Sequence, residues 1–379
     1  MGFLLEGIKA ITIEQIVMYF VGALLIFLAI KKKMEPALLL PMGFGAILVN
    51  LPKSGVLTEN ISEGAGIIEW LFDVGINASE ALPLLLFIGI GAMIDFGPLL
   101  SNPKLIFFGA AAQIGIFIVI ILASLFPSFS LVDAASIGII GAADGPTSIL
   151  VSNQLKSAYA PAIAVAAYSY MALVPVIQPF AIKLVTTKKE RAIKMDYNPK
   201  NVTKLTKIIF PIIVTIVAGL IAPTSVALVG FLMFGNLIRE CGVLNQLSET
   251  ASNTLANLIT LLLGITISFS MKAEDFVKVE TLIIIGLGLF AFVFDSIGGV
   301  LFAKLINIFS KKKINPMIGA AGISAFPMSA RVIQNMGLKE DPTNHLLMHA
   351  VGANVAGQIA SVVAGGAILY IVPLLVEIV

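Results

Sequence analysis

The sequence predicts an all-α polytopic membrane protein, a chain that crosses a lipid bilayer through several helices. Of its 379 residues, 58% are hydrophobic and 12% are charged, and the mean hydropathy is +1.01. Soluble globular chains carry about 25% charged residues, so this charge is too small to cover a surface that faces water. The apolar residues form continuous runs rather than the alternating strands of a membrane β-barrel. The composition therefore excludes a cytosolic enzyme, a nucleic-acid binder and a disordered protein.

About ten apolar runs are candidates for transmembrane helices, each of which needs about 20 mostly apolar residues. In chain order they are Ile16–Ile30, Ala37–Leu51, Leu82–Phe96, Leu105–Phe126, Tyr159–Val185, Ile208–Ala222, Ser225–Ile238, Leu258–Met271, Leu282–Phe309 and His345–Val376. The stretch Ile67–Val74 is predicted as an interfacial helix, because Glu69 and Asp73 interrupt its apolar character.

The basic residues predict the orientation of these spans. Lys and Arg gather at 31–33, 183–207 and 311–313, with eight of them in the middle cluster. The positive-inside rule places such clusters in the cytoplasm. Counting spans from the first cluster puts the other two on the same side. The N- and C-termini are therefore predicted outside and the basic loops cytoplasmic.

Short sequence echoes indicate an internal repeat. Ile140-Gly141-Ala142-Ala143 recurs 178 residues later as Ile318-Gly319-Ala320-Ala321, and Gly89-Ile90-Gly91 is matched by Gly264-Ile265-Thr266. We predict a first repeat at 1–185, a basic cytoplasmic linker at 186–207 and a second repeat at 208–379. Five spans in each repeat, an odd number, place the second repeat upside down in the membrane. Inverted repeats with broken helices are typical of secondary transporters, whose sites lie near the bilayer midplane.

The first broken segment, 136–151, contains the most informative acid. Asp144 stands in an apolar stretch and is followed by Gly145 and Pro146, which prevent a continuous helix, and then by Thr147. A carboxylate at membrane depth costs about 2.5–3.5 kcal/mol on insertion scales, so we expect a functional reason for it. A carboxylate, a hydroxyl and freed carbonyls are oxygen ligands that suit a hard cation such as Na⁺. The alternative is an aspartate that caps the next helix.

The second broken segment, 314–331, offers the amide of Asn315, the hydroxyl of Ser324 and Arg331, one of three arginines in the chain. Each repeat is thus predicted to carry a broken or re-entrant hairpin near the midplane. A guanidinium beside such a break suits a substrate carboxylate, which it binds with two hydrogen bonds. The alternative is an arginine at a helix end that reaches to the membrane interface.

Other polar residues inside the spans are weaker candidates. Asp295 is interpreted either as an ion-pathway residue or as an acid satisfied by a neighbouring helix, and Asn354 lies in the last span. One hydroxyl of Tyr168 or Tyr170 could reach Asp144, although a structural tyrosine explains either residue equally well. A single cysteine excludes a disulfide framework, and two histidines are too few for a histidine-rich metal cage.

Two long strings are similar to the beta subunit of the bacterial sodium-translocating decarboxylases of the oxaloacetate, methylmalonyl-CoA, glutaconyl-CoA and malonate types. One is Gly141-Ala-Ala-Asp144-Gly-Pro-Thr with Tyr170 downstream, and the other runs from Asn315 through Gly319 and Ser324 to Arg331. The resemblance also takes in Gly89-Ile-Gly-Ala-Met-Ile-Asp95-Phe and Phe234-Gly-Asn-Leu-Ile-Arg239, and so covers nearly the whole chain. The N-terminus is shorter than in some members of the oxaloacetate type.

The resemblance implies a subunit that decarboxylates carboxybiotin, exports Na⁺ and consumes a proton. It implies catalytic roles for Asp144, Tyr170 and Arg331, and we assign carboxybiotin binding to Arg331, Asn315 and Gly319. The expected Na⁺ ligands are Asp144, Thr147, Asn315 and Ser324. Biotin is expected on a separate carrier protein, because the chain lacks a biotinylation motif. The other implied partners are a carboxyltransferase alpha subunit and a small single-span gamma or delta subunit, with a trimer of this chain in a bacterial inner membrane.

The alternative function is a secondary carrier, such as a Na⁺- or H⁺-coupled carboxylate symporter or an ion/proton antiporter. Such a carrier shares the inverted repeat, the broken helices and the buried acid. It would move a carboxylate across the membrane unchanged, whereas a decarboxylase subunit releases CO₂ from carboxybiotin. A structural subunit without a site of its own fits less well with two charged residues at the breaks.

Overall fold

The computed structural model describes residues 6–34, 36–58, 66–78, 80–195, 202–221 and 223–378, and these residues contain helices and no strand. Six helices are long and apolar enough to cross a membrane, or up to eight if two bent helix pairs each count as one span. The prediction of an all-α membrane protein is confirmed. The count of ten spans and the two-repeat division at 1–185, 186–207 and 208–379 remain predictions.

The helices of the N-terminal half vary widely in length. They are α1 (Glu6–Lys9), α2 (Ile13–Lys32), α3 (Pro36–Val49), α4 (Ile67–Phe72), α5 (Ala81–Met93), α6 (Gly97–Ser101), α7 (Ile106–Ala111), α8 (Ile114–Ser124), α9 (Leu131–Gly138), α10 (Gly145–Gln154), α11 (Ala160–Val185) and α12 (Lys188–Arg191). The stretch predicted as an interfacial helix contains α4 and continues into a π-helical turn at Asp73–Asn77.

The helices of the C-terminal half include the two longest. They are α13 (Lys204–Ile221), α14 (Val226–Glu240), α15 (Asn245–Glu249), α16 (Ala256–Ile267), α17 (Ala273–Phe276), α18 (Val279–Phe309), α19 (Met317–Ala320), α20 (Met328–Glu340) and α21 (Leu347–Ile378). A second π-helical turn, Thr250–Leu255, precedes α16.

Of the spans predicted as continuous, one is interrupted and another is bent. The predicted span Leu105–Phe126 changes from α7 to α8 at Ala112 and Gln113. Within α11 the axis turns by 73° between Ala160–Met171 and Leu173–Val185. Pro175 explains the bend, because proline lacks the N–H that would bond to the carbonyl of Met171, and its ring crowds that carbonyl.

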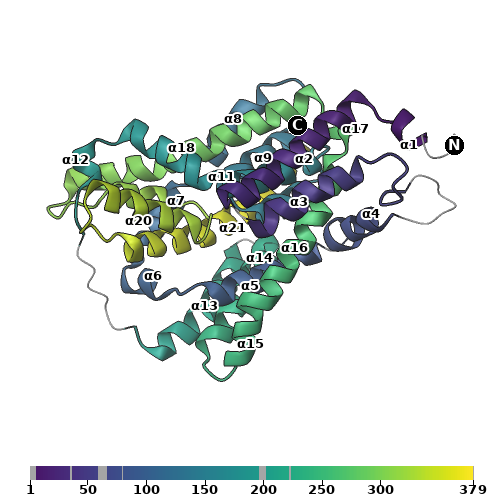
Figure 1. Cartoon of the computed structure of the whole chain (residues 1–379). Coiled ribbons are helices and arrows are strands. Elements are labelled where there is room, and N and C mark those ends of the chain that lie inside the picture. The colour runs from purple at the N-terminus through teal and green to yellow at the C-terminus, as the bar shows by residue number, and fades with distance from the viewer. Residues whose placement is uncertain are drawn as a thin grey trace.

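Helices of the N-terminal half pack against helices of the C-terminal half. Helix α5 packs on α14, and α3 packs on α16. Helix α11 packs on both α18 and α20, and α21 packs on both α7 and α10. The α5–α14 crossing is close, because a Cβ on Gly91 would collide with the carbonyl of Leu232 and a Cβ on Gly235 with that of Ile88. Small residues allow such close approach in membrane helices. Figure 1 shows α5, α13 and α15 gathered below the remaining helices, and α12 and α20 at one end.

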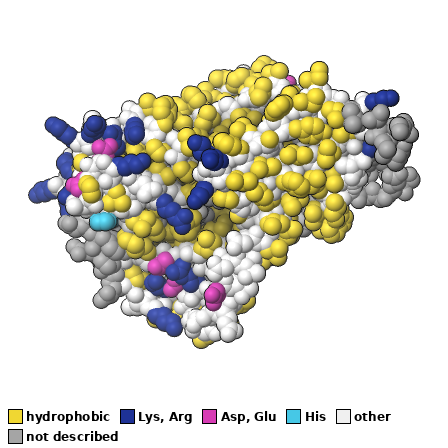
Figure 2. Space-filling view, in the orientation of Figure 1, with side chains coloured by type: hydrophobic (Ala, Val, Ile, Leu, Met, Phe, Trp, Pro, Cys, Tyr) yellow, Lys and Arg dark blue, Asp and Glu magenta, His cyan; other side chains and the backbone are white. Residues whose placement is uncertain are grey.

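The outer surface is apolar over a wide area. Large hydrophobic side chains such as Phe20, Leu220 and Phe309 are 73%, 80% and 83% exposed. Figure 2 shows hydrophobic side chains over a broad face, with many lysines and arginines gathered at the end where α12 and α20 lie. An apolar face of this extent is what contact with lipid tails requires.

Candidate functional site

The two predicted broken segments cross in the interior of the protein. In the first, α9 continues as a 3₁₀ turn that ends at Ala142, Ala143 has a left-handed φ of 54°, and α10 begins after Asp144. In the second, the chain between α19 and α20 is not helical. The N–H of Ser324 donates to the carbonyl of Ala142 over 3.2 Å, and the Ser324 hydroxyl donates to the same oxygen. The two breaks are therefore hydrogen-bonded directly to each other.

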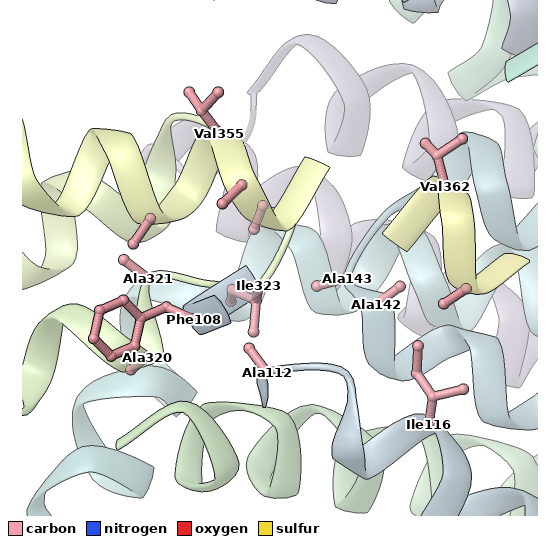
Figure 3. Close-up of a cluster of buried hydrophobic side chains, with 14 of the residues drawn as sticks. Phe108, Ala112, Ile116, Ala142, Ala143, Ala320, Ala321, Ile323, Val355 and Val362 are labelled. Atoms are coloured by element: carbon pink, nitrogen blue, oxygen red, sulfur yellow. The ribbon is translucent and has the colours of Figure 1, made fainter. Parts of the chain in front are cut away.

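Small buried side chains surround this crossing. Figure 3 shows Ala142 and Ala143 of the first break near Ile323 of the second, with Ala112 of the α7–α8 interruption beside them. All four side chains are fully buried. Three interruptions of helical backbone thus meet at one place, which a membrane protein tolerates only inside protein or along a cavity.

Asp144 lies at this crossing with an exposure of 3%. Its Oδ2 accepts a hydrogen bond from the Thr147 hydroxyl at 2.6 Å and from the Ser361 hydroxyl at 3.3 Å. The residue also occupies the N-cap position of α10, where the partial positive charge of a helix N-terminus favours a carboxylate. The helix-cap interpretation and a functional carboxylate therefore describe the same residue.

Helix α21 supplies a polar face that joins both breaks. Asn354, Gln358 and Ser361 are spaced by four and three residues, so they lie on one side of the helix. The Asn354 amide donates to the carbonyl of Ile323 at 2.6 Å, and the Gln358 amide donates to the carbonyl of Ser324. Among the described residues, Oδ1 of Asn354 and Oε1 of Gln358 accept no hydrogen bond. The crossing therefore combines one carboxylate with uncharged oxygens, a donor set that suits a hard monovalent cation.

Tyr168 and Tyr170 have different surroundings. The ring of Tyr168 packs against Gly145, the residue after Asp144, where a Cβ would meet its ring carbons at 2.6 Å. The hydroxyl of Tyr170 instead donates to the carbonyl of Ile285 in α18. Of the two tyrosines, Tyr168 is thus the one that packs on the first break beside Asp144.

Asn315 contacts the linker that follows α11. Its amide donates to the carbonyls of Arg191 and Ile193 at 2.8 and 2.9 Å, and its Oδ1 accepts from the N–H of Met317. In this conformation the side chain ties the entrance of the second break to the basic linker rather than to Asp144.

Arg331 and Gly319 lie on either side of the second break. Arg331 is in the first turn of α20 and is exposed, and it has no ion-pair partner among the described residues. Gly319 faces Gly299 of α18 so closely that a Cβ on either would collide with the carbonyl of the other. Gly319 therefore sets the distance between the break and α18.

Asp295 is fully buried in α18 and caps the α7–α8 interruption. Its Oδ1 accepts a hydrogen bond from the N–H of Gly115 in the first turn of α8. Its Oδ2 lies against Gly141, where a Cβ would come within 2.5 Å, and has no hydrogen-bond partner among the described residues.

Sequence reasoning missed Gln178, Gln113 and Ser361. Gln178 is fully buried in α11, and its amide donates to the Ala320 carbonyl at 2.8 Å and to the Ser329 hydroxyl at 2.7 Å, one on each side of the second break. Gln113 reaches the Gly322 carbonyl at 3.5 Å. An uncharged polar residue inside an apolar span was the available signal, because such residues bond across helices in membranes.

The fold and the crossing define a multi-pass α-helical membrane protein whose interior site is built from interrupted helices. Residues 14–372 match the model of the family described as the Na⁺-transporting oxaloacetate decarboxylase beta subunit. The chain is 48% identical to the methylmalonyl-CoA decarboxylase subunit beta of Propionigenium modestum, over 96% of each chain. It is 48% identical to the glutaconyl-CoA decarboxylase subunit beta of Acidaminococcus fermentans, over 97% of this chain and 96% of that one.

The similarity extends to the oxaloacetate type, since the chain is 42% identical to the oxaloacetate decarboxylase beta chain of Klebsiella pneumoniae over 96% of each. The chain belongs to the family of sodium-transporting decarboxylase beta subunits. It is a membrane subunit of a sodium-translocating decarboxylase, and the alternative of a carrier without decarboxylase chemistry is not favoured.

Proposed function

We propose that this chain decarboxylates carboxybiotin and couples the reaction to export of Na⁺ through the crossing of the two broken segments. The observation that carries the proposal is Asp144, a carboxylate buried at the crossing that accepts hydrogen bonds from the hydroxyls of Thr147 and Ser361. Such an acid is retained at membrane depth only when it is hydrated, paired or bound to a cation.

Na⁺ is the transported substrate, and Asp144 and Thr147 are its proposed central ligands. Asn354 and Gln358 each have one side-chain oxygen free to join them. Ser324 holds the second break against Ala142, so its displacement would change both halves of the site together. Asn315 is proposed to act one step away, by coupling the break to the cytoplasmic linker.

Carboxybiotin supplies the carboxylate that leaves as CO₂, and the ureido nitrogen of biotin takes up one proton in its place. Arg331 is the proposed partner of that carboxylate, with Gly319 and Asn315 shaping the break beside it. Asp144 and Tyr170 are the proposed groups that hold or move the proton. The Tyr170 hydroxyl donates a hydrogen bond to the Ile285 carbonyl, whereas the Asp144 carboxylate accepts a hydrogen bond from Thr147. Asp144 is therefore the favoured group to exchange a proton when Na⁺ leaves.

The proposed assembly contains a carboxyltransferase alpha subunit, a biotin carrier protein and a small single-span gamma or delta subunit, with this chain as a trimer. We propose that it lies in a bacterial inner membrane with its basic loops in the cytoplasm. The paired packing of α5 on α14 and α3 on α16 supports two inverted repeats that alternate access to the site.

The test uses the complete complex reconstituted in vesicles, with CO₂ release and Na⁺ transport measured together. Asp144→Asn keeps an oxygen that accepts hydrogen bonds and removes the negative charge proposed to hold Na⁺, so it should lower both rates by about 100-fold, equivalent to about 2.7 kcal/mol. Asp275→Asn, which removes an exposed aspartate paired with Lys278, is the matched control and should leave both rates unchanged. Normal rates in Asp144→Asn would refute the proposed site, and carboxylate uptake without CO₂ release would refute the proposed reaction.

A further inference from the structure

A groove lies between α11 and α20, and its lining reaches Val332, the residue after Arg331. It encloses about 190 Å³ and is lined by Pro175, Pro179 and Lys183 of α11 and by Val332, Asn335, Met336, Lys339 and Glu340 of α20. Pro175, Pro179 and Lys183 repeat every four residues and so do Asn335 and Lys339, so each of these two sets forms one row along its helix. A cavity below about 300 Å³ is smaller than the pockets of drug-sized ligands, so it would hold only one end of a larger ligand.

The α20 row connects the end of the helix to the break. Arg331, Asn335 and Lys339 are all exposed and follow one another by four residues. Eight residues of helix span about 12 Å. At the far end, Glu340 bonds to Arg191 at 2.6 Å and Asp341 to Lys194 at 3.0 Å, so Lys339 lies beside the basic linker. In Figure 1, α20 and α12 lie at the same end of the molecule.

The charge along this groove is positive and is not neutralised within the described residues. Lys183, Lys339 and Arg331 have no ion-pair or hydrogen-bond partner there, whereas the neighbouring acid, Glu340, is held by Arg191. A row of unpaired polar side chains facing lipid tails would be costly. A water-filled path for an anion accounts for the row without that cost.

Two prolines on the α11 side of the groove remove backbone hydrogen bonds from the helix. Pro179 has no N–H, so the carbonyl of Pro175 lacks its helical hydrogen bond, and Pro175 has the same effect on the carbonyl of Met171. Gln178, between the two prolines, is bonded to both sides of the second break. The groove thus offers cations for a carboxylate, which is the charged group of an N-carboxylated cyclic urea.

We infer that the α11–α20 groove is the entry path of carboxybiotin, with Lys339 and Lys183 attracting the carboxylate at the cytoplasmic mouth and passing it to Arg331 at the inner end. The inference rests on the proposed function and adds two positioning residues and a route to it. Paired surface cations raise the encounter rate of an anion by about 10-fold or more, and the effect weakens as ionic strength rises.

The test compares Lys183→Gln, Lys339→Gln and the double variant in the reconstituted complex, with Lys311→Gln as the control for an exposed lysine outside the groove. The KM for carboxybiotin should rise about 10-fold in the double variant, with kcat changed less than twofold. Added choline chloride at fixed Na⁺ should raise the KM for carboxybiotin more in the wild type than in the double variant, because salt screens the two lysines. An unchanged KM, or an equal effect of Lys311→Gln, would overturn the inference while the decarboxylation by the wild type upholds the proposed function.

A labelling experiment distinguishes an open path from one covered by lipid or by a second copy of the chain. Asn335→Cys in a Cys241→Ser background should react with a water-soluble anionic thiol reagent added at the cytoplasmic face, and carboxybiotin should slow the reaction. Failure to react would overturn the inference, because the groove would then be closed to water. Protection by phospholipid alone, with none by carboxybiotin, would assign the groove to a lipid headgroup instead.

Discussion

The amide of Ser324 donates to the carbonyl of Ala142 over 3.2 Å, a contact between residues that are 182 positions apart. The hydroxyl of Ser324 donates to the same oxygen, so one carbonyl of the first break receives two hydrogen bonds from the second. A carbonyl oxygen has two lone pairs and accepts both. The two halves of the chain are thus joined at the point where both lose their helical backbone bonds.

Ser324→Ala should weaken this junction without breaking it. The variant loses the hydroxyl bond and keeps the N–H bond, and a buried hydrogen bond contributes about 1 kcal/mol. We expect the free energy of unfolding to fall by about that amount and the sodium concentration for half-maximal decarboxylation to rise. Ser124→Ala is the control, since its exposed hydroxyl bonds to the Ile121 carbonyl at 2.8 Å. Equal destabilisation of the two variants in denaturant unfolding would contradict the junction.

Gly319→Ala should lower the stability of the fold more than Gly286→Ala, a substitution in α18, the helix against which Gly319 packs. A Cβ at Gly319 would collide with the Gly299 carbonyl, whereas a Cβ at Gly286 of α18 meets no atom within 4 Å. Overpacking costs about 1–3 kcal/mol, while alanine in a helix is more stable than glycine by about 1 kcal/mol. We therefore expect Gly319→Ala to lower the unfolding midpoint and Gly286→Ala to keep or raise it. The reverse order in thermal unfolding would contradict the close approach of α18.

These residues show how far the sequence could predict the site. Asp144 and the breaks at 136–151 and 314–331 were visible because hydropathy, glycine and proline act locally. The partners of Tyr170 and Asn315 were not visible, because they depend on how each helix is rotated against segments 115 and 124 residues away. The bend in α11 depends on Pro175, which was visible, but the role of Gln178 in bonding both sides of a break required the packed structure.

Asp341 should make the contact between the linker and the α20–α21 turn depend on pH. Hydrogen bonds from the hydroxyl and N–H of Thr343, followed by the contact with Lys194, lower the pKa of Asp341 to about 2. Since the folded pKa is below the ordinary value of 3.8, the stabilisation is present above about pH 4 and is lost as the pH falls toward 2. Wild type and Asp341→Asn should therefore differ in thermal unfolding at pH 5 to 7 and converge in acid. A difference that stays constant down to pH 2 would show that the carboxylate is not responsible.

Asp295 distinguishes a structural acid from an ion-pathway acid. Its Oδ1 accepts the N–H of Gly115, a bond that an asparagine carbonyl can also accept and an alanine cannot. If the residue caps the interrupted α8, Asp295→Asn should stay within about 1 kcal/mol of the wild type in unfolding. Asp295→Ala should lose about 2–4 kcal/mol, because it leaves a buried N–H unpaired and a cavity behind.

The transport measurement completes this comparison, because stability alone does not report on Na⁺. A capping role predicts that Asp295→Asn keeps the sodium dependence of CO₂ release, while Asp144→Asn loses it. The bond to Gly115 favours this outcome, since one carboxylate oxygen is already committed to the backbone of α8. If Asp295→Asn unfolds normally and still loses Na⁺-dependent decarboxylation, its Oδ2, which lies against Gly141 of the first broken segment, belongs to the ion pathway.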